Sequence, residues 1–163
     1  ERIVEPVNYN APGQVVIAGH ADAVAQAIEA AREAGAKRAV ELPVSVPAHS
    51  SLMQSAADEL AETMKQTAFA TPRIPVIHNV DAGLHADAEG IREALRRQLY
   101  NPVRWTDSVQ ALRDAGAEAF VELGPGKVLT GLARRIDRAL SAHAVEDPAG
   151  LEKTLGQFRE QEA

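Results

Sequence analysis

The sequence has 163 residues, of which 45% are apolar and 25% are charged, so it is long and apolar enough for a folded domain with a buried core. The formal net charge of −6 argues against nucleic acid as a partner, because phosphate binding needs a concentrated basic surface. The lack of cysteine excludes disulfides and thiolate metal sites. No apolar run approaches the length of about 18 residues that a membrane span needs, so we expect a cytoplasmic protein.

The first part of the chain, residues 1–46, alternates between strand-like and helical patterns. Residues 3–7 and 14–19 are predicted to pair as a hairpin, because the Pro-Gly dipeptide between them is typical of a turn. A helix is predicted to open at Asp22, and residues 39–46 are predicted to form another strand. The order strand, strand, helix, strand is most of a ferredoxin-like unit without its first strand and helix.

Residues 47–163 continue this alternation. Helices are predicted from apolar residues at helical spacing and from capping residues, and strands from short apolar runs. The predicted helices cover residues 50–66, 88–100, 106–115, 129–140 and the stretch after Asp147-Pro148, and the predicted strands cover residues 74–79, 119–123 and 142–145. Strands that alternate with helices predict an α/β protein with a mostly parallel sheet.

His49 stands at a corner between a predicted strand and a predicted helix. Pro43 and Pro47 keep the residues before them extended and remove backbone donors. The positive end of the following helix disfavours imidazolium, which makes a neutral His49 a candidate base. The alternative is a histidine that merely caps the helix. A base also needs a nucleophile, and no Gly-x-Ser-x-Gly elbow occurs in the sequence.

Gln98 falls on the apolar stripe of the helix predicted over residues 88–100, in line with Ile91, Ala94 and Leu95. A buried amide needs hydrogen-bond partners. Gln98 is therefore either a placed functional group or a residue at the edge of the stripe that reaches solvent.

Two other patterns carry weaker signals. The strand over residues 119–123 runs through Gly124-Pro125-Gly126 into a helix, and free amides at a helix start suit an anion. The spacing matches neither glycine-rich phosphate-binding pattern, so a structural turn is favoured. The histidines lack metal-binding spacing and the carboxylates of the loop over residues 81–89 lack the alternation of a calcium loop. No metal site is predicted, and the charges of that loop are expected to be solvated.

Basic residues stand out in a chain that is acidic as a whole. They are Arg96, Arg97, Arg104, Lys127, Arg134, Arg135 and Arg138. Such residues usually form a solvated helix face paired with nearby carboxylates. The alternative is that an acidic partner docks on them.

Four longer segments, taken together, resemble a known family. They are residues 8–20, 44–50, 97–105 and 122–132, which contain Asn-Tyr-Asn-Ala-Pro-Gly-Gln, Val-Pro-Ala-His-Ser, Arg-Gln-Leu-Tyr-Asn-Pro and Glu-Leu-Gly-Pro-Gly-Lys. In this order they closely resemble the C-terminal half of bacterial malonyl-coenzyme A:acyl carrier protein transacylase. The similarity covers nearly the whole chain, and four motifs of this length are far more specific than any one of them.

The resemblance implies a serine acyltransferase of fatty acid biosynthesis. Such an enzyme takes malonyl from coenzyme A onto a serine and passes it to the phosphopantetheine thiol of acyl carrier protein. His49 corresponds to the catalytic histidine, which activates the serine and protonates the leaving thiolate, and Gln98 to the glutamine whose carbonyl orients that imidazole. Asn8, Asn10 and Gln14 correspond to a polar segment that lines the substrate cleft. No cofactor is implied, since the coenzyme A thioester and the carrier-bound phosphopantetheine are substrates.

The resemblance also implies what the sequence lacks. In the family, the serine elbow, the arginine that pairs with the malonyl carboxylate and the oxyanion-hole segment belong to the N-terminal half. The chain alone is therefore predicted to be inactive and to need that half as a partner, besides malonyl-coenzyme A and acyl carrier protein. A start at Glu1 instead of methionine also indicates a piece of a longer protein.

For the fold, the resemblance implies two parts. Residues 1–46 are expected to form a small ferredoxin-like subdomain that is incomplete at its N-terminus, and residues 47–163 the C-terminal part of a hydrolase-like, parallel α/β large subdomain. Two alternative functions stay open: an acyltransferase domain of a polyketide synthase, and a non-catalytic module that binds carrier protein.

Overall fold

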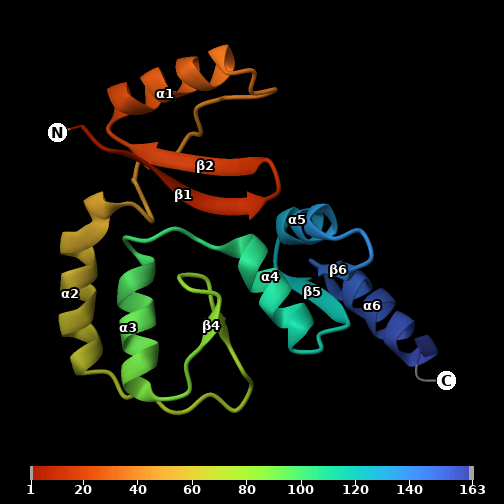
Figure 1. The fold of residues 1–163 in the computed structure, drawn as a ribbon. Helices are drawn as coiled ribbons and strands as arrows, with labels where there is room; N and C mark the ends of the chain where they lie inside the picture. The colour runs from red at the N-terminus through yellow and green to blue at the C-terminus, as the bar shows by residue number, and fades with distance from the viewer. Residues whose placement is uncertain (1, 162–163) are drawn as a thin grey trace. The chain divides into compact units, whose positions relative to one another are not determined.

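The computed structural model describes residues 2–161 and shows an α/β protein (Figure 1). The chain divides after Ser108, within helix α4, into a first and a second compact unit. This division does not coincide with the predicted subdomain boundary between residues 46 and 47, which stays a prediction.

The first unit is built on a hairpin and two long helices that carry the candidate site. Its elements are β1 (Val4–Ala11), β2 (Gln14–Gly19), α1 (Ala21–Glu33), a 3-10 turn η1 (Ser51–Met53), α2 (Gln54–Lys65), β3 (Ile77–His78), β4 (Gly83–Leu84), α3 (Ala88–Gln98) and the start of α4 (Trp105–Asp114). Strands β1 and β2 pair antiparallel, with Tyr9 opposite Val15 and bulges on either side of the central pairs. Gly13 turns the hairpin with a φ of +73°, which side chains disfavour.

Helices α2 and α3 pack against each other through small and apolar side chains. Ala57 and Met64 on α2 and Ile91 and Ala94 on α3 are buried, at the helical spacing that the sequence showed. Helix α3 begins at its N-cap Asp87, whose carboxylate accepts a hydrogen bond from the Gly90 amide at 2.8 Å. The end of α3 contacts His49, and α2 follows the corner at His49 through η1.

The second unit pairs two parallel strands and covers them with helices. Its elements are β5 (Ala119–Leu123), α5 (Val128–Ile136), β6 (Ser141–Val145) and α6 (Pro148–Gln161). Ala119 lies opposite Ser141 and Leu123 opposite Val145. The crossover through α5 makes this pair parallel, since parallel strands need a long connection.

The prediction of a mostly parallel sheet is wrong. Among the described residues there are three two-stranded sheets, and those of β1 with β2 and of β3 with β4 are antiparallel. Both pairs are joined by short turns, which only antiparallel strands allow. The strand predicted over residues 74–79 is reduced to Ile77 and His78.

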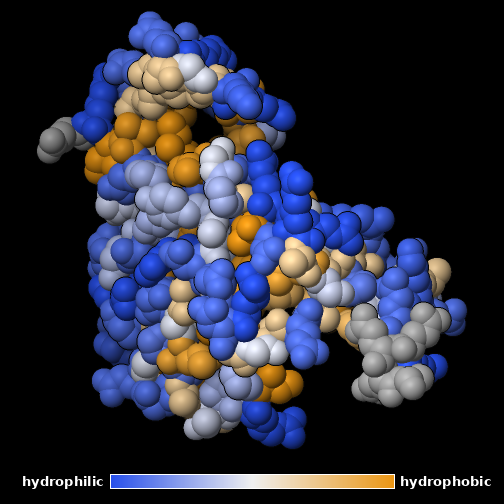
Figure 2. Space-filling model, turned by 45° about the vertical axis from the view of Figure 1, so that its right-hand side comes forward, coloured by the Kyte–Doolittle hydropathy of each residue, from blue (hydrophilic) through white to orange (hydrophobic). Residues whose placement is uncertain are grey.

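The strand predicted over residues 39–46 does not form either. Its pattern is strand-like, but no strand among residues 2–161 pairs with it, and a strand without a ladder partner leaves its backbone groups unsatisfied. Its apolar side chains are exposed: Val44 to 68% and Val46 to 52%. Apolar patches also interrupt an otherwise polar surface in Figure 2. In the part of the chain that the structure describes, no helix has the length and apolar character needed to span a membrane.

Candidate active site around His49

His49 occupies a strained corner directly before η1. Its φ is +66°, in the left-handed region that residues with a side chain rarely adopt. Two hydrogen bonds hold the residue there: its amide donates to the Leu99 carbonyl at 2.9 Å, and its ring nitrogen Nδ1 lies 2.6 Å from the main-chain oxygen of Gln98. The surrounding structure thus fixes both the backbone and the imidazole of His49.

The contact with Gln98 decides which ring nitrogen carries the proton. A carbonyl oxygen only accepts hydrogen bonds, so Nδ1 of the neutral ring donates and Nε2 keeps its lone pair. The side chain is half-buried. The arrangement presents one basic nitrogen in a set orientation, as general base catalysis requires.

Both acceptors of His49 come from the C-terminal end of α3. The last carbonyls of a helix have no partner within it, and His49 takes those of Gln98 and Leu99. From the sequence, the positive end of the helix that follows His49 is expected to disfavour imidazolium. The ring instead contacts the negative end of α3, which stabilises positive charge when Nε2 accepts a proton. This contact bridges 49 residues of sequence, which is why local patterns did not reveal it.

Gln98 contributes a main-chain atom to this contact. Its side-chain amide stands out on the apolar stripe of the sequence, whereas the oxygen that meets His49 belongs to the backbone. The Gln98 side chain is half-buried. Because every residue has such a carbonyl, no sequence pattern could identify this atom.

Glu5 is a residue of the site that the sequence analysis missed. Its carboxylate accepts hydrogen bonds from the amide and the hydroxyl of Ser51, each at 2.7 Å. Ser50, between Ser51 and His49, is fully buried and donates from its hydroxyl to the Pro47 carbonyl at 2.7 Å. Hydrogen bonds therefore connect the corner to β1 through Glu5 and close a local turn between Ser50 and Pro47. A charged residue within the strand predicted over residues 3–7 was the signal that the sequence offered for Glu5.

The three residues predicted to bind substrate lie on the hairpin. Asn8 and Asn10 are half-buried on β1, and Gln14 opens β2 opposite Ala11. Strand β1 also pairs with the segment after α3, because Tyr9 donates to the Val103 carbonyl at 2.9 Å. The hairpin and the His49 corner thus belong to one unit, and the substrate contacts stay a prediction.

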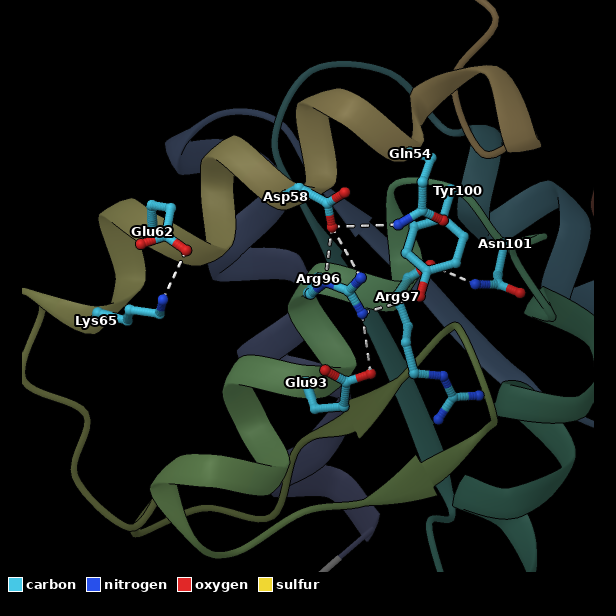
Figure 3. A network of polar contacts seen from close by, with 9 residues as sticks. All are labelled: Gln54, Asp58, Glu62, Lys65, Glu93, Arg96, Arg97, Tyr100 and Asn101. Atoms are coloured by element: carbon cyan, nitrogen blue, oxygen red, sulfur yellow. Dashed lines mark hydrogen bonds and ion pairs between the residues drawn. The ribbon is translucent and has the colours of Figure 1, made fainter.

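A polar network joins α2 to α3 (Figure 3). The Arg96 guanidinium donates to Asp58 at 2.8 and 3.2 Å and to the Tyr100 hydroxyl at 3.2 Å. The hydrogen bond from Arg96 lowers the pKa of Asp58. Gln54, at the start of α2, donates to the same carboxylate at 3.3 Å. The network links the beginning of α2 to the end of α3, the two helix ends nearest His49.

Other basic residues also pair with carboxylates. Arg97 lies 3.4 Å from Asp81, Arg104 lies 2.7 Å from Asp107, and Lys127 lies 3.7 Å from Glu146. These contacts agree with the interpretation of a paired, solvated helix face. The docking of an acidic partner stays a prediction.

In the loop predicted over residues 81–89, Asp87 and Glu89 are exposed as expected, whereas Asp81 and His85 are partly buried. The Asp81 side chain is 24% exposed and accepts from Nε2 of His85 at 3.1 Å. Burial lowers the pKa of His78, whose ring packs edge-on against His85. Among residues 2–161, no group of three histidine or acidic side chains is placed to hold a metal ion.

Comparisons with known proteins identify the family of the chain. The profile of the acyl transferase domain family matches residues 2–159, so the chain belongs to that family. It is 54% identical over 156 residues to the malonyl CoA-acyl carrier protein transacylase of Salmonella typhimurium, covering 96% of this chain and 50% of that protein. The chain thus spans about half the length of the curated relatives it matches.

Solved structures show the same relationship. An acyl carrier protein S-malonyltransferase of Vibrio cholerae superposes with a TM-score of 0.91 at 54% identity, covering 94% of this chain and 50% of that one. A malonyl-transacylase solved in complex with a type II polyketide synthase acyl-carrier protein superposes with a TM-score of 0.94 at 52% identity, covering 96% and 50%. These proteins are what the chain is similar to in sequence and fold.

Proposed function

We propose that this chain supplies the catalytic base of a malonyl-coenzyme A:acyl carrier protein transacylase. The observation that carries the proposal is the 2.6 Å contact between Nδ1 of His49 and the Gln98 main-chain oxygen. It fixes the ring and leaves Nε2 free to take a proton. Relatives that are named for this transfer share the fold and about half their length with the chain.

In the first half of the reaction, Nε2 of His49 takes the hydroxyl proton of a serine while the serine oxygen attacks the thioester carbonyl of malonyl-coenzyme A. The resulting imidazolium is held by the Gln98 carbonyl, whose dipole takes the place of the acid in Ser-His-Asp triads. As the tetrahedral intermediate collapses, Nε2 returns the proton to the departing thiolate. The products are a malonyl-serine ester and free coenzyme A.

The second half reverses these roles with a new thiol. Nε2 takes the proton of the phosphopantetheine thiol of acyl carrier protein, and the thiolate attacks the serine ester. The serine oxygen leaves and recovers its proton from the imidazolium. One histidine thus serves as base and as acid in both halves, so that no proton is lost to solvent and no cofactor is consumed.

We place the serine, the oxyanion donors and the arginine that binds the malonyl carboxylate in a second polypeptide segment. The sequence has no Gly-x-Ser-x-Gly elbow, and the curated relatives are about twice as long as the matched region. The exposed apolar residues between 40 and 46 are the surface we assign to that segment, since three half-exposed or exposed valines and a leucine in a segment without a strand partner indicate a missing neighbour. The chain alone is then inactive.

The predicted substrate contacts and subdomains complete the proposal. Asn8, Asn10 and Gln14 contact the acyl or pantetheine part of the substrate, with amide groups that suit its carbonyls and amides. Residues 1–46 form the small ferredoxin-like subdomain and residues 47–163 the C-terminal part of the large hydrolase-like subdomain.

A second candidate function is the same transfer to the carrier protein of a polyketide synthase. One relative was solved with a type II polyketide synthase acyl-carrier protein. The chemistry at His49 is identical in both cases, and only the carrier differs.

The proposal is tested by His49→Ala in a complete enzyme that contains this chain. We expect malonyl transfer to carrier protein, followed by mass spectrometry of the carrier, to fall at least about 100-fold, the size typical of general base catalysis. His143→Ala is the matched control, because His143 lies on β6 in the second unit and bonds to Ser141 at 2.8 Å. Near-normal turnover of His49→Ala, or equal losses in both variants, would contradict the proposal.

A further inference from the structure

The shortest hydrogen bonds at the end of α3 come from groups outside the helix. The last backbone hydrogen bonds, from Leu99 to the Arg96 carbonyl and from Tyr100 to the Arg97 carbonyl, are both 3.3 Å long. They span three residues, as in the weaker 3-10 pattern. The short contacts come from outside the helix: Asn101 donates from its side chain to the Arg97 carbonyl at 2.8 Å, and His49 takes the next two carbonyls at 2.6 and 2.9 Å.

Asn101 is placed for this contact by the residue that follows it. Pro102 disfavours helical backbone at the preceding position and so ends the helix. The Asn101 side chain turns back toward the Arg97 carbonyl, as Figure 3 shows. The carbonyls of Arg97, Gln98 and Leu99 thereby all have partners: backbone and Asn101 for Arg97, and His49 for Gln98 and Leu99.

We propose that Asn101 is a positioning residue, which sets the Gln98 carbonyl against the His49 ring. The Arg97 carbonyl lies in the same peptide plane as the nitrogen and Cα of Gln98. An anchored Arg97 carbonyl therefore restricts the orientation of Gln98 and of its own carbonyl. Without the Asn101 amide, the last turn depends on the two 3.3 Å bonds and on His49 itself. The Gln98 oxygen is then free to tilt away from Nδ1, and the preference of the ring for a proton on Nδ1 weakens.

The catalytic meaning of this role rests on the proposed function, whereas the geometry can be tested without it. Two variants remove the donor: Asn101→Asp, which keeps the shape but sets a carboxylate against a carbonyl, and Asn101→Ala. The matched control is Asp87→Ala, which removes the cap at the opposite end of the same helix. All three weaken α3, and only the Asn101 variants act at its His49 end.

The measurement is the ¹⁵N spectrum of the His49 ring in a complete enzyme that contains this chain, assigned with His49→Asn. We expect both Asn101 variants to lose the Nδ1–H preference, while Asp87→Ala keeps it. In the complete enzyme, we expect both Asn101 variants to lower kcat about 10-fold or more with little change in KM, because a small displacement of a catalytic group is costly.

Unchanged His49 nitrogen signals in both Asn101 variants would overturn the inference, as would an equal change in Asp87→Ala. A loss of the Nδ1–H preference that leaves kcat intact would overturn its catalytic part. Failure of the proposed function is read separately, from a His49→Ala enzyme that still transfers malonyl.

Discussion

Two places in the molecule lead through a corner into a helix, and they use the free ends of helices differently. At the His49 corner, the orphan carbonyls of α3 hold a histidine that arrives from 49 residues away and keeps one nitrogen free. At the Gly124–Gly126 turn, the orphan amides of α5 are taken by Glu122, seven and eight residues before them, at 3.0 and 2.7 Å. The end of α3 binds the His49 ring and leaves Nε2 available for proton transfer, whereas the start of α5 is capped by Glu122 from the preceding strand β5.

The Gly124–Gly126 turn positions Glu122 at the start of α5, and this explains why the turn does not form an anion-binding site. Gly124 and Gly126 have φ values of +130° and +92°, which only glycine adopts without strain. They let the chain turn tightly enough for Glu122 to reach the amides of Leu129 and Thr130. Although burial raises the pKa of Glu122, the hydrogen bonds from these amides lower it below the ordinary value. A carboxylate of the chain itself occupies the position that a bound anion would take.

The largest effect on stability is expected at the first corner from Ser50→Val. Ser50 is fully buried and bonds to the Pro47 carbonyl, so the substitution crowds a packed position and removes a hydrogen bond. We expect a loss of about 2 kcal/mol in the free energy of unfolding, measured with urea. Ser55→Val on the exposed side of α2 is the control and should change it by less than about 0.5 kcal/mol. Equal losses of unfolding free energy in the two variants would contradict the claim that the buried Ser50 stabilises the corner.

Glu5→Ala should come next, with a loss of about 1 kcal/mol from the two hydrogen bonds to Ser51. In the complete enzyme we also expect lower transfer activity, because the link between β1 and the corner is gone. Ser51→Ala keeps the hydrogen bond from the residue 51 main-chain amide to Glu5, so it should have a smaller effect on both measurements. A larger loss of unfolding free energy in Ser51→Ala than in Glu5→Ala would contradict the claim that the Glu5 carboxylate holds the corner on β1.

Glu122→Ala should cost a similar amount, about 1 kcal/mol, as the loss of a helix cap does, but should leave transfer activity unchanged. The folded pKa of Glu122 is depressed, so its contribution is present above the unfolded pKa and is lost as pH falls through the folded pKa. Unfolding of Glu122→Gln should therefore depend less on acid than that of the parent chain. The exposed Glu118→Ala is the control, and an equal response of both variants would contradict the capping role.

The smallest effect should come from Gln98→Ala. The main-chain oxygen that holds His49 survives this change, so we expect kcat to fall less than about threefold and the His49 ring to keep its proton on Nδ1. A loss comparable with that of His49→Ala would show that the side-chain amide carries the function.

The helices and the hairpin could be predicted because local signals specify them. Helix α3 has an N-cap at Asp87, an apolar face and a stop before Pro102, and each of these acts within a few residues. The segment over residues 39–46 shows the limit of such signals. Its strand pattern is clear, but a strand exists only where another strand pairs with it, and none of the described strands does.

Two residues of the candidate site could be named from the sequence, but the atoms through which they meet could not. The family motifs drew attention to His49 and Gln98, and the structure brings both together. That the contact uses a main-chain oxygen could not be known from the sequence, since the backbone is the same for every residue. Glu5 and Asn101 were missed because each acts on a partner that its local sequence pattern does not reveal, Glu5 across 46 residues and Asn101 on the main chain of Arg97.

The most direct test of the account is the protonation of the His49 ring, read from the ¹⁵N signals of its two nitrogens at a pH where the ring is neutral. The account predicts a proton on Nδ1 and a bare Nε2, because the Gln98 carbonyl can only accept. A proton on Nε2, or exchange between the two nitrogens without preference, would contradict the claim that the end of α3 prepares His49 as a base.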